Sequence, residues 1–439
     1  MTAAHELAVK HETAPPLPLE PPLDPWEQAD EPTPFWGARA VLGHVHDFAR
    51  ARMVSPWAML GVVLVRVTTA VPPFVVLPPI VGSVASLNTF AALTGPSGAG
   101  KGAAESAGTE AVDVGPLTVA SVGSGEGIAH LYAHREKGEV VRDREAVVFS
   151  IPEVDNLTAL GTRRGATLLP QLRSAWTGET LGFSYADRDK ALPIERHTYR
   201  MGLLLGVQPG RAAPLVDDSD GGTPQRFVWL PTTDPDAPDF PPACPEPLDW
   251  RPTWRWHGDA RGLCVLPVPD VARQTIIGAR RARLRGDGDA LDGHALLCRL
   301  KVAAALALLD ERQAVDDEDW QLAGAVMQVS DSTRAAVVRH LAARAEDANR
   351  ARGQAEAARA VVVSETVHTE QVKRVAGVVL RALRRREGDG WATRRDLAAA
   401  VAGRDRGVLA EAIGVQLDAG QIETDTTTNT VLYRVAEGR

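Results

Sequence analysis

The sequence predicts an α/β protein with a mostly parallel sheet, followed by a helical region and a small C-terminal module. Three observations support this prediction. Short apolar segments alternate with helical ones between residues 87 and 231, as in sheets whose strands are connected by helices. A glycine-rich segment, GPSGAGKG, separates the first of these strands from the next helix. Residues 366–439 show three helical segments and then two short strands.

The composition is that of a globular chain with more than one domain. The chain has 439 residues, 44% of them hydrophobic, and a formal net charge of −8, so two or three domains are expected. This charge argues against a uniformly basic surface for nucleic acid, but not against local basic patches. The three cysteines have neither zinc-ligand nor disulfide-framework spacing, and the N-terminus lacks a signal-peptide pattern, so we expect a cytoplasmic protein.

One apolar stretch, residues 58–82, is long enough to raise the question of a membrane span. It contains Arg66 and four prolines, which favour a buried helix followed by extended chain. We therefore expect no membrane partner.

Shifts in composition divide the chain into six parts. Residues 1–33 are rich in proline and are predicted to be a disordered arm. The other predicted parts are a helical lead-in (34–86), the sheet-containing core (87–231), a Pro- and Asp-rich linker (232–250), a helical lid with a long helix (251–365), and the C-terminal module (366–439).

Within the core, five strands are predicted from short apolar segments. They are expected at residues 90–94, 117–122, 146–151, 201–207 and 227–230, with helices from about 127 and over 168–176. In the helical region, apolar residues spaced by three and four predict helices over 271–285, 291–310 and 317–360.

The C-terminal module has the pattern of a winged helix-turn-helix. An amphipathic helix is expected over 372–386, a second one capped by Thr393, and a third over 405–419 that ends at Gly420, before two strands around a TTTN turn. Four basic residues around the second and third helices favour DNA contact: Arg394, Arg395, Arg404 and Arg406. Glu411 and Asp418 on the third helix oppose it, so docking of a protein remains the alternative.

The glycine-rich segment has the chemistry of a phosphate-binding loop. Its residues are Gly95, Pro96, Ser97, Gly98, Ala99, Gly100, Lys101 and Gly102. Glycines let backbone N–H groups surround phosphate oxygens, a helix N-terminus adds partial positive charge, and Lys101 neutralises the β- and γ-phosphates. We therefore expect ATP and Mg²⁺ here. Gly102 stands where a Ser or Thr hydroxyl usually binds Mg²⁺, so metal binding is expected to be weakened.

Polar residues after the third and fourth strands complete the predicted ATPase site. Glu153 is expected to orient the attacking water and Asp155 to bind Mg²⁺, although the two roles are interchangeable. Pro152 stands where an Asp-Glu pair would usually begin. Gln208 is expected to contact the γ-phosphate.

Two arginines are candidates for stabilising transition-state charge. In a ring assembly, Arg226 could reach the nucleotide of a neighbouring subunit as an arginine finger, and an ordinary surface arginine is the alternative. Arg299 could act similarly from the helical lid.

The order of these motifs resembles the helicase-like P-loop ATPases of phages, prophages and plasmids, of the primase-associated replicative type. The similar segments span roughly residues 34–345: WAMLGVVLVRV, GPSGAGKG, FSIPEVDNL, LLPQLRSAWTGETLGFSYADRDK, LLLGVQPGR, DGGTPQRFVWLP and RLKVAAALALLDERQAVDDEDWQLA. The resemblance implies a DNA-dependent ATPase or helicase loader in mobile-element replication. It also implies a homo-oligomeric ring and a primase or other replication proteins as partners.

The resemblance gives a role to residues 179–200. In hexameric helicases of similar design, a hairpin at this place grips single-stranded DNA in the central pore. Tyr185, Arg188 and Lys190 would supply the aromatic ring and positive charges for that contact. An ordinary surface hairpin is the alternative.

Two other functions remain open at this stage. A nucleotide-gated DNA-binding regulatory protein would bind ATP but hydrolyse little of it, because of Gly102 and Pro152. A small-molecule kinase would use the same glycine loop, but the helical tail and C-terminal module do not suit it.

Overall fold

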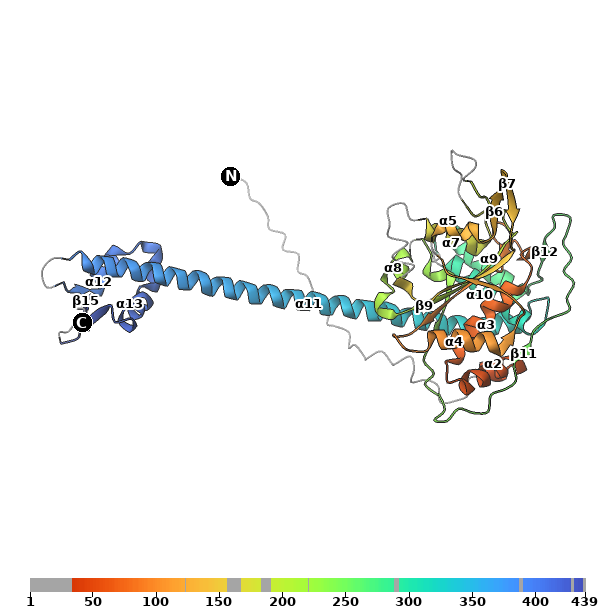
Figure 1. Ribbon diagram of the computed structural model, residues 1–439, viewed down its shortest axis with the longest axis horizontal. Coiled ribbons are helices and arrows are strands. Elements are labelled where there is room, and N and C mark those ends of the chain that lie inside the picture. Colours follow the sequence, from red (N-terminus) through yellow and green to blue (C-terminus); the bar gives the residue numbers. More distant parts are fainter. Residues whose placement is uncertain are drawn as a thin grey trace, which may run out of the picture. The chain divides into compact units, whose positions relative to one another are not determined.

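The computed structural model describes residues 34–122, 124–155, 167–182, 191–219, 221–287, 292–386, 390–427 and 430–436. The chain divides into two compact units, Met1–Ala343 and Arg344–Arg439. Figure 1 shows the sheet and most helices in the first unit, and three short helices or strands labelled α12, α13 and β15 in the second. The proline-rich arm expected at 1–33 lies outside the described residues.

A five-stranded parallel sheet forms the centre of the first unit. Its strand order is β10-β3-β9-β8-β5, and every pairing is parallel. The strands are β3 (Thr89–Thr94), β5 (Thr118–Ala120), β8 (Ala146–Ile151), β9 (Arg200–Val207) and β10 (Phe227–Pro231). All five predicted strands are present and the predicted parallel arrangement is confirmed.

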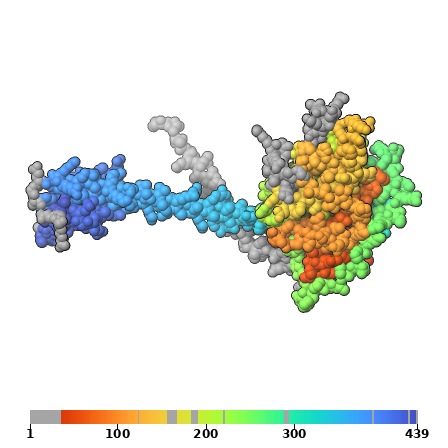
Figure 2. Space-filling view, in the orientation of Figure 1, coloured from red at the N-terminus to blue at the C-terminus, as the bar shows by residue number. Residues whose placement is uncertain are grey.

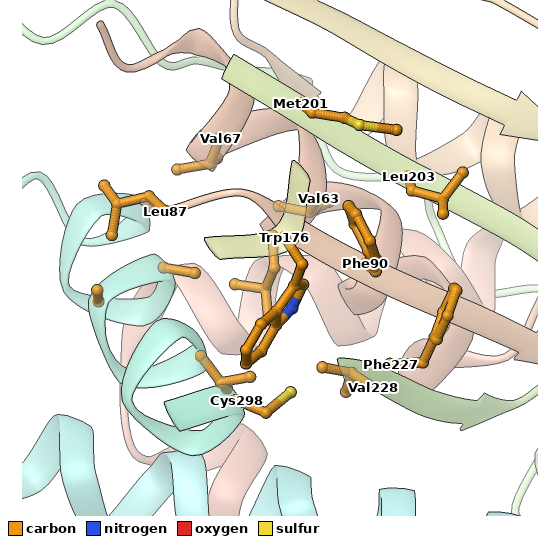
Figure 3. Close-up of a cluster of buried hydrophobic side chains, with 14 of the residues drawn as sticks. Val63, Val67, Leu87, Phe90, Trp176, Met201, Leu203, Phe227, Val228 and Cys298 are labelled. Atoms are coloured by element: carbon orange, nitrogen blue, oxygen red, sulfur yellow. The ribbon is translucent and has the colours of Figure 1, made fainter. Parts of the chain in front are cut away.

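Helices and loops bury both faces of β10, β3, β9 and β8, in keeping with their largely apolar sequences. β5 differs, since Thr118 and Val119 are exposed. Ala91 and Leu204 face α3 (Pro56–Ala70) and α4 (Lys101–Ala111). Side chains of opposite parity, such as Phe90 and Leu203, belong to a second cluster. In Figure 3 this cluster also contains Trp176, from α7 (Leu168–Thr177), and Phe227.

The lead-in begins with three helices, α1 (Pro34–Gly37), α2 (Ala40–Ala51) and α3. Ser55 begins α3 because its side chain accepts the N–H of Ala58, and Pro56 occupies the first turn. Thirteen residues of α3 are buried, so it is the buried helix that the sequence predicted. In the part of the chain that the structure describes, no helix is long and apolar enough to cross a membrane.

Short strands lie around the main sheet. β1 (Val75–Leu77), β2 (Ala85–Ser86) and β12 (Cys264–Val265) form a three-stranded sheet, and β4 (Val112–Asp113) pairs with β11 (Leu248–Asp249). After α5 (Gly125–His130) comes a hairpin that the sequence did not predict, β6 (Ala133–Glu136) and β7 (Glu139–Arg142). The linker region, green in Figure 2, runs over the surface of the first unit.

Three longer helices follow, and one of them differs from expectation. They are α9 (Asp270–Leu284), α10 (Asp292–Leu309) and α11 (Asp317–Arg384). The sequence predicted a helix ending near 360 and a separate one over 372–386, whereas α11 is continuous. The reason is local: α11 contains no proline, and its interior glycines, such as Gly353, each cost only about 1 kcal/mol.

The second unit joins the end of α11 to β13 (Ala392–Thr393), α12 (Arg394–Ala400), α13 (Leu409–Asp418), β14 (Ile422–Asp425) and β15 (Leu432–Val435). Its core includes Val375 and Val379 of α11. Thr393 caps α12 as predicted, in a capping box with Asp396. The three strands form one antiparallel sheet. The third predicted helix is shorter than expected, because residues 403–408 form a 3₁₀ helix first.

Candidate functional site at the carboxyl edge of the sheet

The glycine loop joins β3 to α4 with two residues in the left-handed region. Gly98 and Gly100 both have φ of 78°, a conformation in which other residues are strained. Gly100 is also the residue that precedes the first turn of α4. Pro96, Ser97 and Gly98 are exposed. The loop therefore presents accessible backbone just before the N-terminus of an eleven-residue helix, where partial positive charge favours an anion.

Lys101 folds back over this loop. Its Nζ donates to the carbonyl oxygens of Gly95, at 3.0 Å, and Pro96, at 2.7 Å. Partial burial lowers the pKa of Lys101, and the nearby Glu153 carboxylate partly opposes this. The Lys101 ammonium is thus bound by two neutral carbonyl oxygens of the loop. Because an anionic acceptor forms a stronger hydrogen bond with an ammonium, such an acceptor can replace them.

Two contacts show how closely the backbone packs beside the loop. A Cβ added to Gly206, near the end of β9, would lie 1.9 Å from the carbonyl oxygen of Pro152 and 3.5 Å from Cδ of Lys101. A Cβ added to Gly95 would lie 1.9 Å from Oγ1 of Thr232. Glycine at these positions lets the ends of β8, β9 and β10 approach the glycine loop.

The strand order brings Glu153 and Gln208 together. β9 lies between β3 and β8, so Gln208 follows a strand that separates the glycine loop from the acidic segment. Nε2 of Gln208 donates to Oε1 of Glu153 at 3.4 Å, and the electrostatic effect of Glu153 on Lys101 places all three side chains at one edge. Three side chains that the sequence suggested for the ATPase site therefore lie together: those of Lys101, Glu153 and Gln208.

Asp155 has a partner that the sequence analysis missed. Its carboxylate forms an ion pair with the guanidinium of Arg211, which belongs to the 3₁₀ turn Pro209–Arg211 after β9. Both side chains are partly exposed. The sequence signal was present in LLLGVQPGR, where Arg211 follows Gln208 by three residues.

The structure describes few side chains near the glycine loop that could bind a metal ion. Among the described residues, no group of three or more His, Cys, Asp or Glu side chains could hold an ion. A Cβ on Gly102 would meet no atom within 4 Å, so a serine fits there without steric cost. Glu153 and Asp155 follow β8, the strand next to β9, and Asp155 is engaged with Arg211.

Arg226 lies at the other end of the sheet. It immediately precedes β10, whose carboxyl end is Pro231, so the length of the strand, roughly 3.3 Å per residue, separates it from the glycine-loop edge. Its Nη1 donates to the carbonyl oxygens of Gly221, at 2.8 Å, and Gly222, at 2.7 Å. Burial lowers its pKa to about 10. In this conformation Arg226 is turned inward, which does not favour the predicted role in a neighbouring subunit.

Arg299 is engaged within the lid. Its guanidinium donates to the carbonyl oxygen of Trp320 at 2.7 and 3.1 Å and lies 4.0 Å from the centre of the Trp320 ring. Like Arg226, it is held by its own chain.

The predicted DNA-gripping residues Tyr185, Arg188 and Lys190 lie outside the described residues. The described flanks of this segment pair with each other, since Leu181 and Ile194 form an antiparallel bridge with both N–H···O distances at 3.0 Å.

In the second unit, the four candidate arginines are all exposed: Arg394, Arg395, Arg404 and Arg406. The helix α13 has no lysine or arginine, and its exposed residues include Glu411, Val415 and Asp418. Positive charge therefore lies on α12 and the 3₁₀ segment, beside an α13 face that is neutral to acidic.

No protein-family model matches this chain. No curated protein matches it either.

Proposed function

We propose that this chain binds ATP at the carboxyl edge of its parallel sheet and couples the nucleotide to DNA as a P-loop ATPase. The observation that carries the proposal is the glycine loop itself. Two left-handed glycines expose backbone before α4, and Lys101 is held on loop carbonyls. A triphosphate would replace these carbonyls as the acceptor of Nζ, while the helix N-terminus favours the same negative charge.

The neighbouring residues support hydrolysis as the next step. Glu153 and Gln208 are hydrogen-bonded beside the loop, where a base and a γ-phosphate contact are needed. Mg²⁺, when bound with ATP, supplies neutralisation of the phosphate charge. Glu153 and Asp155 are the side chains that would hold it, directly or through water.

Titration with a fluorescent ATP analogue, mant-ATP, tests the nucleotide site. We expect Lys101→Ala to weaken binding by about 100-fold, equivalent to roughly 2.7 kcal/mol, because it removes a charge-assisted contact. Lys137→Asn is the matched control. Lys137 lies in the β6–β7 turn with φ of 51°, which asparagine tolerates. Equal affinities in wild type and Lys101→Ala would exclude this site.

One observation favours the second function, a nucleotide-gated DNA-binding regulator. The ion pair between Asp155 and Arg211 occupies the carboxylate that was expected to hold Mg²⁺, and Gly102 provides no hydroxyl. A protein of this kind would bind mant-ATP but show little phosphate release with or without single-stranded DNA. Strong stimulation of phosphate release by DNA would instead establish the motor.

For the second unit we propose a winged helix that contacts the phosphate backbone through α12 and the 3₁₀ segment. The exposed arginines there support phosphate contacts, whereas the acidic α13 face does not suit base readout. Replacing Arg394, Arg395, Arg404 and Arg406 by glutamine is expected to weaken duplex binding uniformly across sequences and to reduce its salt dependence. Unchanged binding would favour protein docking.

A further inference from the structure

A cavity of about 310 Å³ opens at the amino edge of the main sheet, away from the glycine loop. Its wall includes Ala85, which precedes β3, and Arg196, which precedes β9. Thr177 at the end of α7 contributes, as do residues of α9 and α10. Since the main strands are parallel, residues that precede them gather at the edge opposite to the predicted ATP site.

Much of the cavity wall is apolar. Ile80, Val84, Ile276, Leu296, Leu297 and Leu300 line it. Val81, at the same wall, is 43% exposed. Apolar surface left accessible in a concave site costs free energy that a bound apolar group recovers, at about 25 cal/mol per Å².

Cationic groups converge on one side of this apolar surface. Arg196, Arg280 and Arg283 line the cavity against a single carboxylate, that of Glu179. No described carboxylate forms an ion pair with Arg196 or Arg280. The hydrogen bond of Arg196 to Ser83 Oγ is long, at 3.4 Å. These two guanidinium groups are therefore available to an anion.

His294, which also lines the cavity, does not compete for that anion as a cation at neutral pH. Its burial, with Arg226 and Arg283 nearby, lowers the pKa of His294 to about 4. The ring is therefore neutral, and it adds polar atoms without adding charge.

A second cavity of about 530 Å³ adjoins the first through shared residues. Ser83, Val84 and Arg196 line both, and Arg261 lines the second. Like that of Arg196, the guanidinium of Arg261 forms no ion pair with a carboxylate among the described residues, although the Arg261 backbone N–H donates to Asp259. Positive charge thus accumulates at this edge in a chain whose formal net charge is −8.

We propose that the 310 Å³ cavity binds a small molecule with one anionic group on an apolar body, such as a short-chain carboxylate. Arg196 and Arg280 hold the anion, and the leucine and isoleucine side chains of α9 and α10 cover the apolar body. A ligand in this place connects α9 and α10 to the chain around Arg196, which lies within the predicted DNA-gripping segment 179–200. The inference does not depend on ATP binding at the glycine loop.

The full chain is titrated with 1-anilinonaphthalene-8-sulfonate, a fluorescent dye with this chemistry, and octanoate is then added as a competitor. We expect one saturable dye site that octanoate displaces and that 1-octanol, of equal chain length and no charge, displaces at least tenfold less well. Arg196→Gln combined with Arg280→Gln is expected to lower the affinity for the dye at least tenfold. Leu297→Gln, which keeps both arginines, is also expected to weaken it.

Arg281→Gln is the matched control, because Arg281 is exposed on α9 and does not line the cavity. Its dye affinity should stay within twofold of wild type. Equal losses in Arg281→Gln and the double variant would overturn the proposal, as would unchanged affinity in the double variant or equal competition by octanol. All variants should bind mant-ATP like wild type, so failure of this site and failure of the ATP site are separate results.

Discussion

The two edges of the main sheet both hold a lysine on backbone carbonyls, but in opposite environments. At the amino edge, Lys301 is fully buried, donates to the carbonyls of Asn88 (2.7 Å) and Trp176, and lies 3.8 Å from the centre of the Trp176 ring. Burial holds the pKa of Lys301 well below its usual value. At the carboxyl edge, Lys101 makes the same kind of bonds within a loop that is open to solvent.

The difference indicates what each lysine does. Asn88 and Trp176, whose carbonyls accept from Lys301, are both fully buried, so the interaction is part of the core. Carbonyls around Lys101 can be solvated when the ammonium leaves. Arg200 extends the amino-edge pattern, since its guanidinium donates to three carbonyls and to Ser86. Lys301 and Arg200 therefore stabilise the fold at the amino edge, whereas we propose that Lys101 at the carboxyl edge exchanges its carbonyl partners for a ligand.

The largest expected effect is therefore at Lys301. Lys301→Met keeps most of the side-chain volume but leaves two buried carbonyls without this donor, which at about 1–3 kcal/mol each should lower the free energy of unfolding by about 2–5 kcal/mol. Urea unfolding followed by tryptophan fluorescence measures it. Lys373→Met, at an exposed position of α11, is the control and should change little. A loss below about 1 kcal/mol at Lys301 would remove the contrast between the edges.

A smaller destabilisation is expected at one point of the carboxyl edge. Gly206→Ala places a Cβ against the Pro152 carbonyl oxygen, and relieving this overlap should cost about 1–3 kcal/mol. It should also weaken mant-ATP binding, because β8 and β9 move apart beside Lys101. Gly102→Ala, with open space around its Cβ, is the control and should be neutral or slightly stabilising. Equal stability of the two variants would contradict this prediction, because it would show that the backbone around Pro152 accommodates the added methyl group without loss of stability.

The pH dependence of stability should come from the amino edge. Burial and the adjacent arginines lower the pKa of His197 to about 4, so the unfolded chain binds a proton between about pH 6.5 and 4 that the native chain does not. Stability is thus lost as the pH falls through this window, by about 2 kcal/mol from this residue between pH 7.5 and 5. His197→Asn should remove about half of the dependence, because His294 has a similarly lowered pKa, and asparagine tolerates the φ of 57° at position 197. If the pH dependence of stability is unchanged in this variant, the proton that the chain takes up on unfolding binds a residue other than His197.

The smallest structural effect is expected for Gly102→Ser. The position is exposed and open, so the unfolding free energy should change by less than about 0.5 kcal/mol. Its informative readout is phosphate release in Mg²⁺. Faster release would show that the missing hydroxyl limits hydrolysis, and an unchanged rate would show that other groups hold the metal.

The sequence predicted features that depend on local pattern. The five strands, the glycine loop between β3 and α4, and the Thr393 cap all follow from apolar runs, glycines and capping residues. It could not predict that the Arg226 side chain turns inward, because that conformation depends on the carbonyls of Gly221 and Gly222. The Asp155–Arg211 pair likewise depends on strand order, which joins segments more than fifty residues apart.

The continuity of α11 shows the limit of helix-end signals in sequence. Residues 361–371 offered a change in character, from alanine-rich to valine- and threonine-containing, but no glycine or proline to end a helix. Such residues lower helix propensity only slightly, so the helix continues. The change in composition over residues 361–371 therefore does not correspond to the end of a helix.

We propose that the carboxyl edge exchanges the carbonyl partners of Lys101 for phosphate. Calorimetric titration of ATP into the full chain and into Lys101→Ala tests it, with urea unfolding of both proteins alongside. We predict binding by the wild type, a loss of about 100-fold in the variant, and unfolding free energies that agree within about 1 kcal/mol. Equal ATP affinities, or a variant that loses stability as Lys301→Met does, would contradict the account.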